Sequence, residues 1–177
     1  MITALYAVGP NGEFGLRGKL PWGSFREELD AFYSQLDVLN PDNIIIGAGT
    51  YLALPEVVRQ RMIGESDLFI RADRPLPDDI KHGIYTPISK IGDTLPTFLK
   101  DQQTVVLGGA TLLYEMYIHG HIESAFVSTI FSTQKLEADV YLDNTILDYN
   151  YESTRLVYAT GANSDNSLRF VQELVTY

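Results

Sequence analysis

Cysteine is absent from this chain of 177 residues, which also contains only three histidines and one tryptophan. The lack of cysteine excludes disulfides, thiolate metal sites and a cysteine nucleophile. The sequence also lacks any apolar run of about eighteen residues and any charged-then-apolar leader, so it predicts neither a membrane span nor a secretory signal. We therefore expect a cytoplasmic protein with no membrane partner.

Basic residues are few relative to acidic ones. There are 13 Lys and Arg against 23 Asp and Glu, which gives a formal net charge of −10. A field of this sign repels phosphate, so we expect no nucleic-acid partner. An anionic ligand must then meet locally placed Arg, Lys or backbone N–H groups. Because 45% of the residues are hydrophobic, we expect one well-buried core and one domain over residues 1–177.

Apolar and β-branched segments alternate with segments of helical period. Strands are predicted at residues 2–8, 43–47, 67–71, 83–85, 104–107 and 124–130, with a closing antiparallel pair at 151–158 and 168–176. Helices are predicted at residues 25–39, from about residue 50, and after Gly108-Gly109 through Tyr117. This order predicts a single-domain α/β fold with a mostly parallel central sheet flanked by helices and an antiparallel C-terminal strand pair. Ligands of such sheets bind at the carboxyl ends of strands, here after Val8, Ile46, Ile70 and Leu107.

Two of these strand ends carry glycine junctions, written "IIIGAGT" and "VVLGGAT". Each brings backbone N–H groups and a helix N-terminus toward the space above it, which suits phosphate. For a single junction, a glycine that only closes a tight turn is the more ordinary explanation. The pair favours a ligand with two phosphates, such as a dinucleotide. Neither junction is a Rossmann fingerprint, because Leu52 stands where a third Gly or Ala is required, and no P-loop motif is present.

Glu28 borders the apolar stripe of the first predicted helix, between Phe25 and Phe32, whereas Glu27 and Asp30 lie further toward solvent. One interpretation is an acid in the first helical turn, favoured by the helix dipole. The other is a half-buried carboxylate that requires a cationic or hydrogen-bonding ligand. Helical periodicity does not decide between the two.

Five blocks in order, "YAVGPNGEFGLRGKLPWGSFREELDAF", "IIIGAGTYLALP", "VVLGGATLLYE", "FVSTI" and "ADVYLDN", resemble the dihydrofolate reductase family nearly end to end. The short helices "LALPEVV" and "GGATLLY" are more similar to the bacteriophage members than to bacterial chromosomal ones. The resemblance implies that NADPH transfers hydride from nicotinamide C4 to C6 of 7,8-dihydrofolate, with a proton reaching N5. The product is 5,6,7,8-tetrahydrofolate.

The same resemblance implies a substrate site around Glu28, which would hydrogen-bond the pterin 2-amino group and N3. Ser128 matches the family hydroxyl beside this carboxylate. Trp22 would lie at the hinge of the closing loop, residues 9–20, and hold an ordered water near Glu28. Arg61, with Arg59 as the alternative, would pair with the folate glutamate. The pocket would be lined by Leu5, Ala7, Leu29, Phe32, Leu54, Val58 and Leu107, each of which on its own is an ordinary core residue.

The cofactor site implied by the resemblance centres on the two glycine junctions, with a cis peptide bond expected between Gly108 and Gly109. Ala48 and Gly49 occupy the positions where the family carries a basic residue for the 2′-phosphate, and Arg71 is the nearest substitute. Tyr114 resembles a tyrosine near the nicotinamide. The full expected set is Ala7, Phe14, Gly15, Lys19, Leu20, Gly47, Ala48, Gly49, Thr50, Arg71, Leu107, Gly108, Gly109, Ala110, Thr111 and Tyr114.

Other polar residues give weaker signals. His119 and His121 are two residues apart, a poor spacing for a helical metal pair, so we interpret both as surface residues and predict no metal site. No Gly-x-Ser-x-Gly nucleophile motif is present. Tyr6 replaces a small residue of the family pattern, and it either alters the pocket or faces the opposite side of the sheet.

Two rival functions remain at this point. One is a pyrimidine reductase of the riboflavin-biosynthesis type, which shares the architecture, although Glu28 behind "LPW" disfavours it. The other is a noncatalytic folate-binding or dinucleotide-binding component with the same fold. For the reductase we expect dihydrofolate as the small-molecule substrate and a monomer or weak homodimer.

Overall fold

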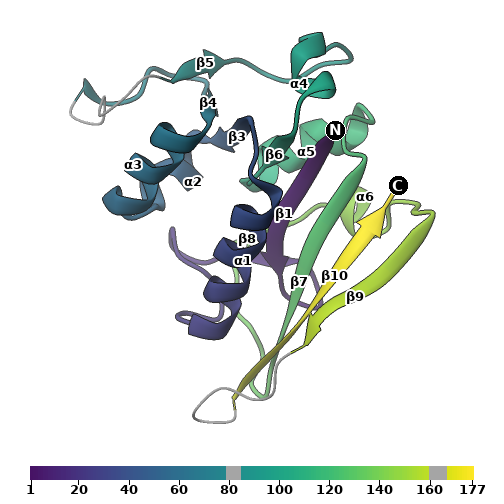
Figure 1. The fold of residues 1–177 in the computed structure, drawn as a ribbon. Helices are drawn as coiled ribbons and strands as arrows, with labels where there is room; N and C mark the ends of the chain where they lie inside the picture. The colour runs from purple at the N-terminus through teal and green to yellow at the C-terminus, as the bar shows by residue number, and fades with distance from the viewer. Residues whose placement is uncertain (79–84, 160–166) are drawn as a thin grey trace.

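The computed structural model describes residues 1–78, 85–159 and 167–177, and these form one α/β layer structure around an eight-stranded sheet (Figure 1). The strand order is β5-β4-β3-β6-β1-β7-β10-β9. The parallel strands are β1 (Ile2–Val8), β3 (Asn43–Gly47), β4 (Asp67–Arg71), β5 (Thr86–Ile88), β6 (Thr104–Val106) and β7 (Ser124–Ser132). Two antiparallel strands, β10 (Leu168–Thr176) and β9 (Ser153–Ala159), complete one edge. The predicted fold class is confirmed.

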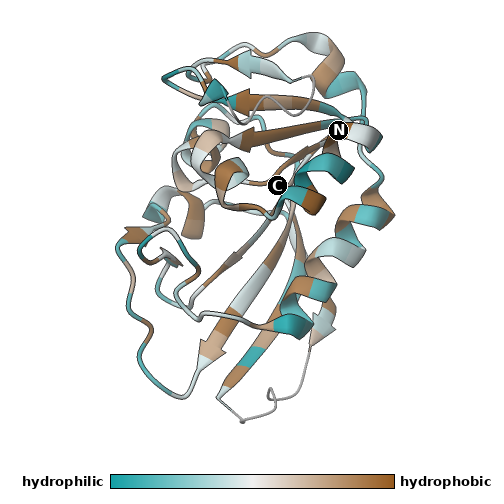
Figure 2. Ribbon diagram, turned by 90° about the vertical axis from the view of Figure 1, so that its left-hand side faces the viewer, coloured by the Kyte–Doolittle hydropathy of each residue, from teal (hydrophilic) through white to brown (hydrophobic). Residues whose placement is uncertain are grey.

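Helices cover both faces of the parallel strands. They are α1 (Arg26–Leu39), α2 (Ala48–Ala53), α3 (Glu56–Glu65), α4 (Thr97–Asp101), α5 (Ala110–Ile118) and α6 (Asn144–Leu147). The central strands β1, β3, β4 and β6 are mostly apolar, as Figure 2 shows in brown, because this part of the sheet is covered on both faces and nearly all of its side chains are buried. Alternate residues of β1 divide between two cores: Leu5 packs with Ile44 and Phe126, whereas Ala4 and Tyr6 pack on the opposite face.

Tyr6 therefore faces away from the predicted substrate pocket. Its hydroxyl lies 3.3 Å from the hydroxyl of Tyr117 on α5, and the side chain is 6% exposed. Burial raises the pKa of the Tyr6 phenol well above its usual value. Of the two alternatives for this residue, the structure selects the one that leaves the pocket unaltered.

Helix α1 is positioned at both ends by its flanking residues. Phe25, in extended conformation immediately before the helix, is buried and makes an edge-to-face contact with Phe170 at a ring distance of 5.4 Å. Asn40 ends the helix in the left-handed conformation with φ 42°, which asparagine tolerates better than most residues, and Pro41 follows. The helix thus starts and stops close to the predicted bounds.

Three predictions about local structure need correction or limits. The helical segment expected from about residue 50 is two helices, because Leu54 before Pro55 is extended and breaks it. His121 is not a surface residue: it is 5% exposed and bonded through Nε2 to the Gly92 carbonyl, since the chain packs there on residues 91–93. Gly83 and Ile84 of the predicted strand 83–85 lie outside the described residues.

The loop between β1 and α1 is tied to the segment that follows β7. Its short strand β2 (Glu13–Gly15) pairs with β8 (Val140–Tyr141), and the Arg17 backbone N–H donates to Asp139. Of the described helices, none combines the length and the apolar character that crossing a membrane requires.

Candidate active site

The two glycine junctions lie against each other at the carboxyl ends of β3 and β6. The Gly47 N–H donates to the Gly108 carbonyl at 2.6 Å. A Cβ on Gly47 would lie 2.9 Å from the Gly109 backbone nitrogen, and a Cβ on Gly109 would lie 3.1 Å from Thr50 Oγ1. Glycine is therefore required for this close backbone approach. The peptide bond between Gly108 and Gly109 is cis, as expected.

A cavity of about 330 Å³ opens beside these junctions. It brings together most of the residues expected to hold the pyrophosphate, and four residues that the sequence did not indicate, Ala72, Asp73, Leu112 and Val140. The expected ones are Gly47, Ala48, Gly49, Thr50, Arg71, Gly109, Ala110 and Thr111. Its wall is largely backbone and small side chains, which suits an extended ligand that hydrogen-bonds N–H groups.

Arg71 lines this cavity, but its guanidinium already has two carboxylate partners. Nε and one terminal nitrogen donate to Glu115 at 3.1 Å and 2.6 Å, and the other terminal nitrogen donates to Asp73 at 2.6 Å. Glu115, on α5 and 3% exposed, also accepts from the Ile91 N–H at 3.1 Å. The Glu115 hydrogen bond is the main cause that raises the pKa of Arg71. The sequence did not reveal this pairing, because Glu115 and Arg71 are 44 positions apart.

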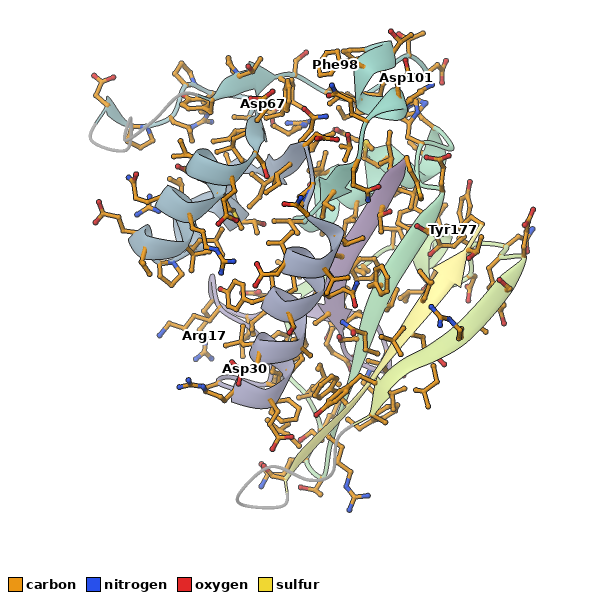
Figure 3. The ribbon with its side chains drawn as sticks, viewed as in Figure 1. Arg17, Asp30, Asp67, Phe98, Asp101 and Tyr177 are labelled. Carbon is orange, nitrogen blue, oxygen red and sulfur yellow. The ribbon has the colours of Figure 1, made fainter. Side chains whose placement is uncertain are left out.

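Glu28 is buried on the sheet side of α1, with 2% of its surface exposed. Asp30, two residues later, projects away from the sheet and is 67% exposed (Figure 3). Burial raises the pKa of Glu28 to about 7, and a hydrogen bond with Ser128 opposes part of the rise. Glu28 Oε1 has no hydrogen-bond partner among the described residues. Glu28 lies in the first turn of α1, as the helix-dipole interpretation has it, and it is also buried, as the ligand-binding interpretation requires.

Ser128 contacts this carboxylate, and Trp22 is buried in the cluster at the start of the same helix. Ser128 is 2% exposed on β7, in register with Ala7 of β1, and interacts with Glu28 as described above. Trp22 is 8% exposed and packs in one cluster with Phe25, the residue that precedes α1. Within the described chain, Trp22 Nε1 is buried without a partner, as is Glu28 Oε1.

Apolar residues expected around the pterin gather beside Glu28. Leu5 and Leu107 are buried in one cluster, against which Phe32, Leu54 and Val58 are partly buried. Leu29 is also half-buried, and Ala7 packs in the neighbouring cluster with Trp22.

The two arginine candidates for the folate glutamate differ in their surroundings. Arg61 on α3 forms ion pairs with Asp37 of α1 and, at 3.3 Å, with Glu65, and its side chain is about half exposed. Arg59 lies over the Tyr51 ring, 5.5 Å from the centroid, and its Nε is buried without a partner among the described residues.

The remaining expected cofactor residues surround the cavity less closely. Phe14 approaches Gly108, with Cζ 3.5 Å from the position that a Gly108 Cβ would occupy. Gly15 lies against Val140, which lines the cavity. Lys19 is exposed, Leu20 is 38% exposed, and Tyr114 is 39% exposed on α5 outside the cavity lining.

No cluster of three or more potential ligands for a metal ion is found among residues 1–78, 85–159 and 167–177. The prediction of no metal site was made from sequence spacing and stays a prediction.

Comparison with known proteins gives one decisive match. No family model matches the chain. Over 177 residues, and over 100% of both chains, it is 90% identical to the curated dihydrofolate reductase of Escherichia phage T5. Among solved structures, it is similar to dihydrofolate reductase from Enterococcus faecalis complexed with NADP(H) and RAB-propyl, at TM-score 0.65 and 16% identity, over 99% of this chain and 95% of that one. The latter likeness shows the fold, and the full-length identity to the phage protein shows that the chain belongs to the dihydrofolate reductase family.

Proposed function

We propose that this site reduces 7,8-dihydrofolate to 5,6,7,8-tetrahydrofolate with NADPH, and that Glu28 binds and orients the pterin. The observation that supports this proposal most directly is a buried carboxylate, with one oxygen that has no partner among the described residues, at the same edge of the sheet as the glycine cavity. The edge is shared because Ser128, which bonds Glu28, is in register with Ala7 near the carboxyl end of β1. Family membership favours this reaction over that of a pyrimidine reductase.

The residues of the glycine cavity fit a dinucleotide. At Gly47 a Cβ would meet the Gly109 backbone and at Gly109 it would meet the Thr50 hydroxyl, so this part of the wall is bare backbone next to the N-termini of α2 and α5. Thr50, Ala110 and Thr111 then supply further donors around the pyrophosphate. When bound, NADPH supplies the hydride from its nicotinamide C4 to pterin C6.

Glu28 acts on the pterin through hydrogen bonds and charge. The 2-amino group and N3 of the pterin donate to the carboxylate, and these donors favour the ionised form over the half-protonated state expected near pH 7. The negative charge raises the basicity of N5 without touching it, and the proton arrives through water. Trp22 Nε1 can donate to such a water, and Glu28 Oε1 can accept from it.

The apolar residues around Glu28 orient the rings and exclude bulk water. Leu5 and Leu107 are buried, and Phe32 and Leu54 are partly buried against the same cluster. A dry site strengthens the interaction between the carboxylate and the pterin, and fixed rings hold the reacting carbons together. The loop of residues 9–20 closes over this side.

For the folate glutamate, we propose Arg59 in preference to Arg61. Arg61 already pairs with two carboxylates, whereas Arg59 Nε is buried and free of described partners. Arg59→Ala should raise KM for dihydrofolate more than Arg61→Ala does, while KM for a pterin without the glutamate should change little for either variant. Equal effects of the two variants would leave Arg59 without this role.

Arg71 faces the expected position of the 2′-phosphate, but Glu115 and Asp73 neutralise it. We therefore infer that discrimination against NADH is weaker than an unpaired arginine would give. The site takes dihydrofolate as a small-molecule partner and has no nucleic-acid partner. We further propose that the enzyme acts in the cytoplasm as a monomer or weak homodimer, which sedimentation velocity would test.

Replacement of Glu28 by Gln tests the proposed function. We expect Glu28→Gln to slow single-turnover hydride transfer by about a hundredfold or more, because a neutral amide does not raise N5 basicity. Binding of NADPH, followed by quenching of Trp22 fluorescence, should change less than about threefold. Glu27→Gln, the same change on an exposed residue of the same turn, is the matched control. Small and equal effects on transfer and cofactor binding would contradict the assigned role.

A further inference from the structure

A buried polar row crosses the sheet under helix α1. In the β7–β10 pairing, Ile130 is in register with Phe170, Ser128 with Gln172, and Phe126 with Leu174. Residues in register on paired strands point to the same face of a sheet. Ser128 and Gln172 therefore lie side by side on one face, between two rows that are wholly apolar.

Helix α1 places Glu28 above this polar row. Phe25, before the helix, packs on Phe170 of the first apolar row. Phe32, further along the helix, packs in the cluster that contains Phe126 and Leu174 of the other apolar row. Glu28 lies between these two contacts, and its hydrogen bond with Ser128 fixes it over the middle row. Gln172 is thus the second polar side chain beneath the carboxylate.

Gln172 is 2% exposed, and its amide Nε2 is buried without a hydrogen-bond partner in the described part of the chain. Buried amide donors are normally satisfied, so an unpaired one requires an explanation. The unpaired atom of Glu28 is an acceptor, Oε1, and the unpaired atom of Gln172 is a donor. The two are complementary.

We propose that Gln172 is a positioning residue of the active site, whose amide N–H donates to the Glu28–Ser128 pair and stabilises the ionised carboxylate. The terminal amide torsion of glutamine is broad, so rotation about it directs Nε2 toward the neighbouring Ser128 hydroxyl, whose hydrogen then points to Glu28. A water bridging Nε2 and Oε1 has the same electrostatic effect. The importance of this contact for turnover rests on the proposed function of Glu28, but the contact itself does not.

The groups that face Glu28 are few. On the same helix, Tyr33 interacts electrostatically with Glu28: burial and the Glu28 charge both raise the pKa of the Tyr33 phenol. Glu27 and Asp30 are exposed on the solvent side of α1. The strands beneath present Ser128, Gln172 and Ala7, which do not titrate, and Tyr158 of β9, which is in register with Gln172 at the outer end of the row. Trp22, from the preceding segment, is likewise neutral.

Titration of Glu28 in the ligand-free protein tests the proposal directly. Glutamate labelled with 13C at the side-chain carboxyl gives a resonance for Glu28 that is identified by its loss in Glu28→Gln. Donation to the anion lowers the pKa of a carboxyl group, so Gln172→Met, which keeps length and removes the donor, should raise the midpoint by about half a pH unit or more. Gln172→Glu, which adds a second acid, should raise it further.

Two comparisons show whether the shift comes from the amide. Leu174→Met changes packing at the next row of β10 and should leave the midpoint unchanged. When Gln172→Met is added to Ser128→Ala, the change in the Glu28 midpoint should differ from the change that Gln172→Met causes in the native protein, because the two groups act on one carboxylate. If Gln172→Met does not fold, Gln172→Asn, which withdraws the amide by one methylene, should give a smaller upward shift.

An unchanged Glu28 midpoint in folded Gln172→Met or Gln172→Asn would overturn the proposal, as would an equal shift in Leu174→Met. Because the proposed reaction uses ionised Glu28, hydride transfer should decline as the pH falls through the Glu28 midpoint. The pH of half-maximal hydride transfer should therefore be higher in Gln172→Met than in the native protein. If Glu28→Gln left hydride transfer intact while the titration shifts were observed, the proposed function would fail and the Gln172 contact would stand.

Discussion

Glu28→Gln should gain stability relative to the native protein as the pH rises, even though it impairs catalysis. Burial raises the pKa of Glu28 from an ordinary 4.5 to about 7, so the folded state holds a proton on this group where the unfolded chain has lost it. A raised acid pKa means that the native state binds more protons between these two values, and stability therefore falls as pH rises through the window. Glutamine has no such charge to bury.

The size of the effect follows from the two pKa values. Each unit of difference between the two pKa values changes the free energy of unfolding by about 1.4 kcal/mol once Glu28 is fully ionised in both states. Below pH 7 only part of this change is present. Between about pH 5.5 and 8.5, the native protein should lose about 2 kcal/mol relative to Glu28→Gln through this group alone. Any pH-independent effect of the new amide, such as an unsatisfied N–H beside Ser128, cancels in the difference between the two pH values.

Equilibrium urea unfolding measures this difference, with the fluorescence of the single tryptophan, Trp22, as the signal. The lower pH stays above the sequence pI of 4.6, where the net charge keeps the protein soluble. The control is Glu27→Gln, an exposed acid on the same turn, which has no burial to relieve. Its unfolding free energy relative to the native protein should be nearly independent of pH.

A free-energy difference between Glu28→Gln and the native protein that changes by less than about 0.5 kcal/mol over this range would refute the reasoning. It would mean that the carboxylate is ionised in the folded state at little cost, and the site would then lack the apolar surroundings on which its action on the pterin depends. A change of opposite sign would show that the native state stabilises the anion.

Three further predictions concern the cofactor side. Arg71→Ala should reduce the free energy of unfolding by about 3–5 kcal/mol, because it leaves buried Glu115 without its counter-charge, and adding Glu115→Leu should recover much of the loss in the same urea assay. Gly47→Ala should lower stability by about 1–3 kcal/mol and weaken NADPH binding, since the new Cβ meets backbone, whereas Gly49→Ala, whose Cβ meets no protein atom, should leave the free energy of unfolding nearly unchanged. Asp73→Asn should raise the ratio of kcat/KM for NADPH over NADH, because it frees one side of Arg71 and removes a charge that repels phosphate; an unchanged ratio would remove this pair from the 2′-phosphate site.

Much of the fold was predictable because its strands are short apolar runs closed by glycine, proline or asparagine. β1, β3, β4 and β10 lie within a residue of their predicted bounds. The misses occur where local signals are weak: α4 and α6 are only five and four residues long, and the break at Pro55 interrupts an otherwise continuous helical pattern. Such elements are stabilised by packing and carry little periodicity of their own.

The candidate site, like the fold, was predictable only in part from the sequence. The two glycine junctions and the acid at residue 28 are visible in the sequence, since each is a local violation of what a strand end or a helix stripe ordinarily contains. For His121, by contrast, the sequence predicts a surface position, which is wrong because its burial depends on a contact with Gly92, 29 positions away.

The sequence by itself determined which segments become strands and helices, where bare backbone faces a ligand, and that an acid borders the core. Only the tertiary structure decided which charges are already paired and which polar groups share a row. Arg71 meets Glu115, and Gln172 joins Ser128 under Glu28, because strand order and register bring them together. Periodicity of a few residues fixes the face of an element, but it carries no information about the partner that a distant segment supplies.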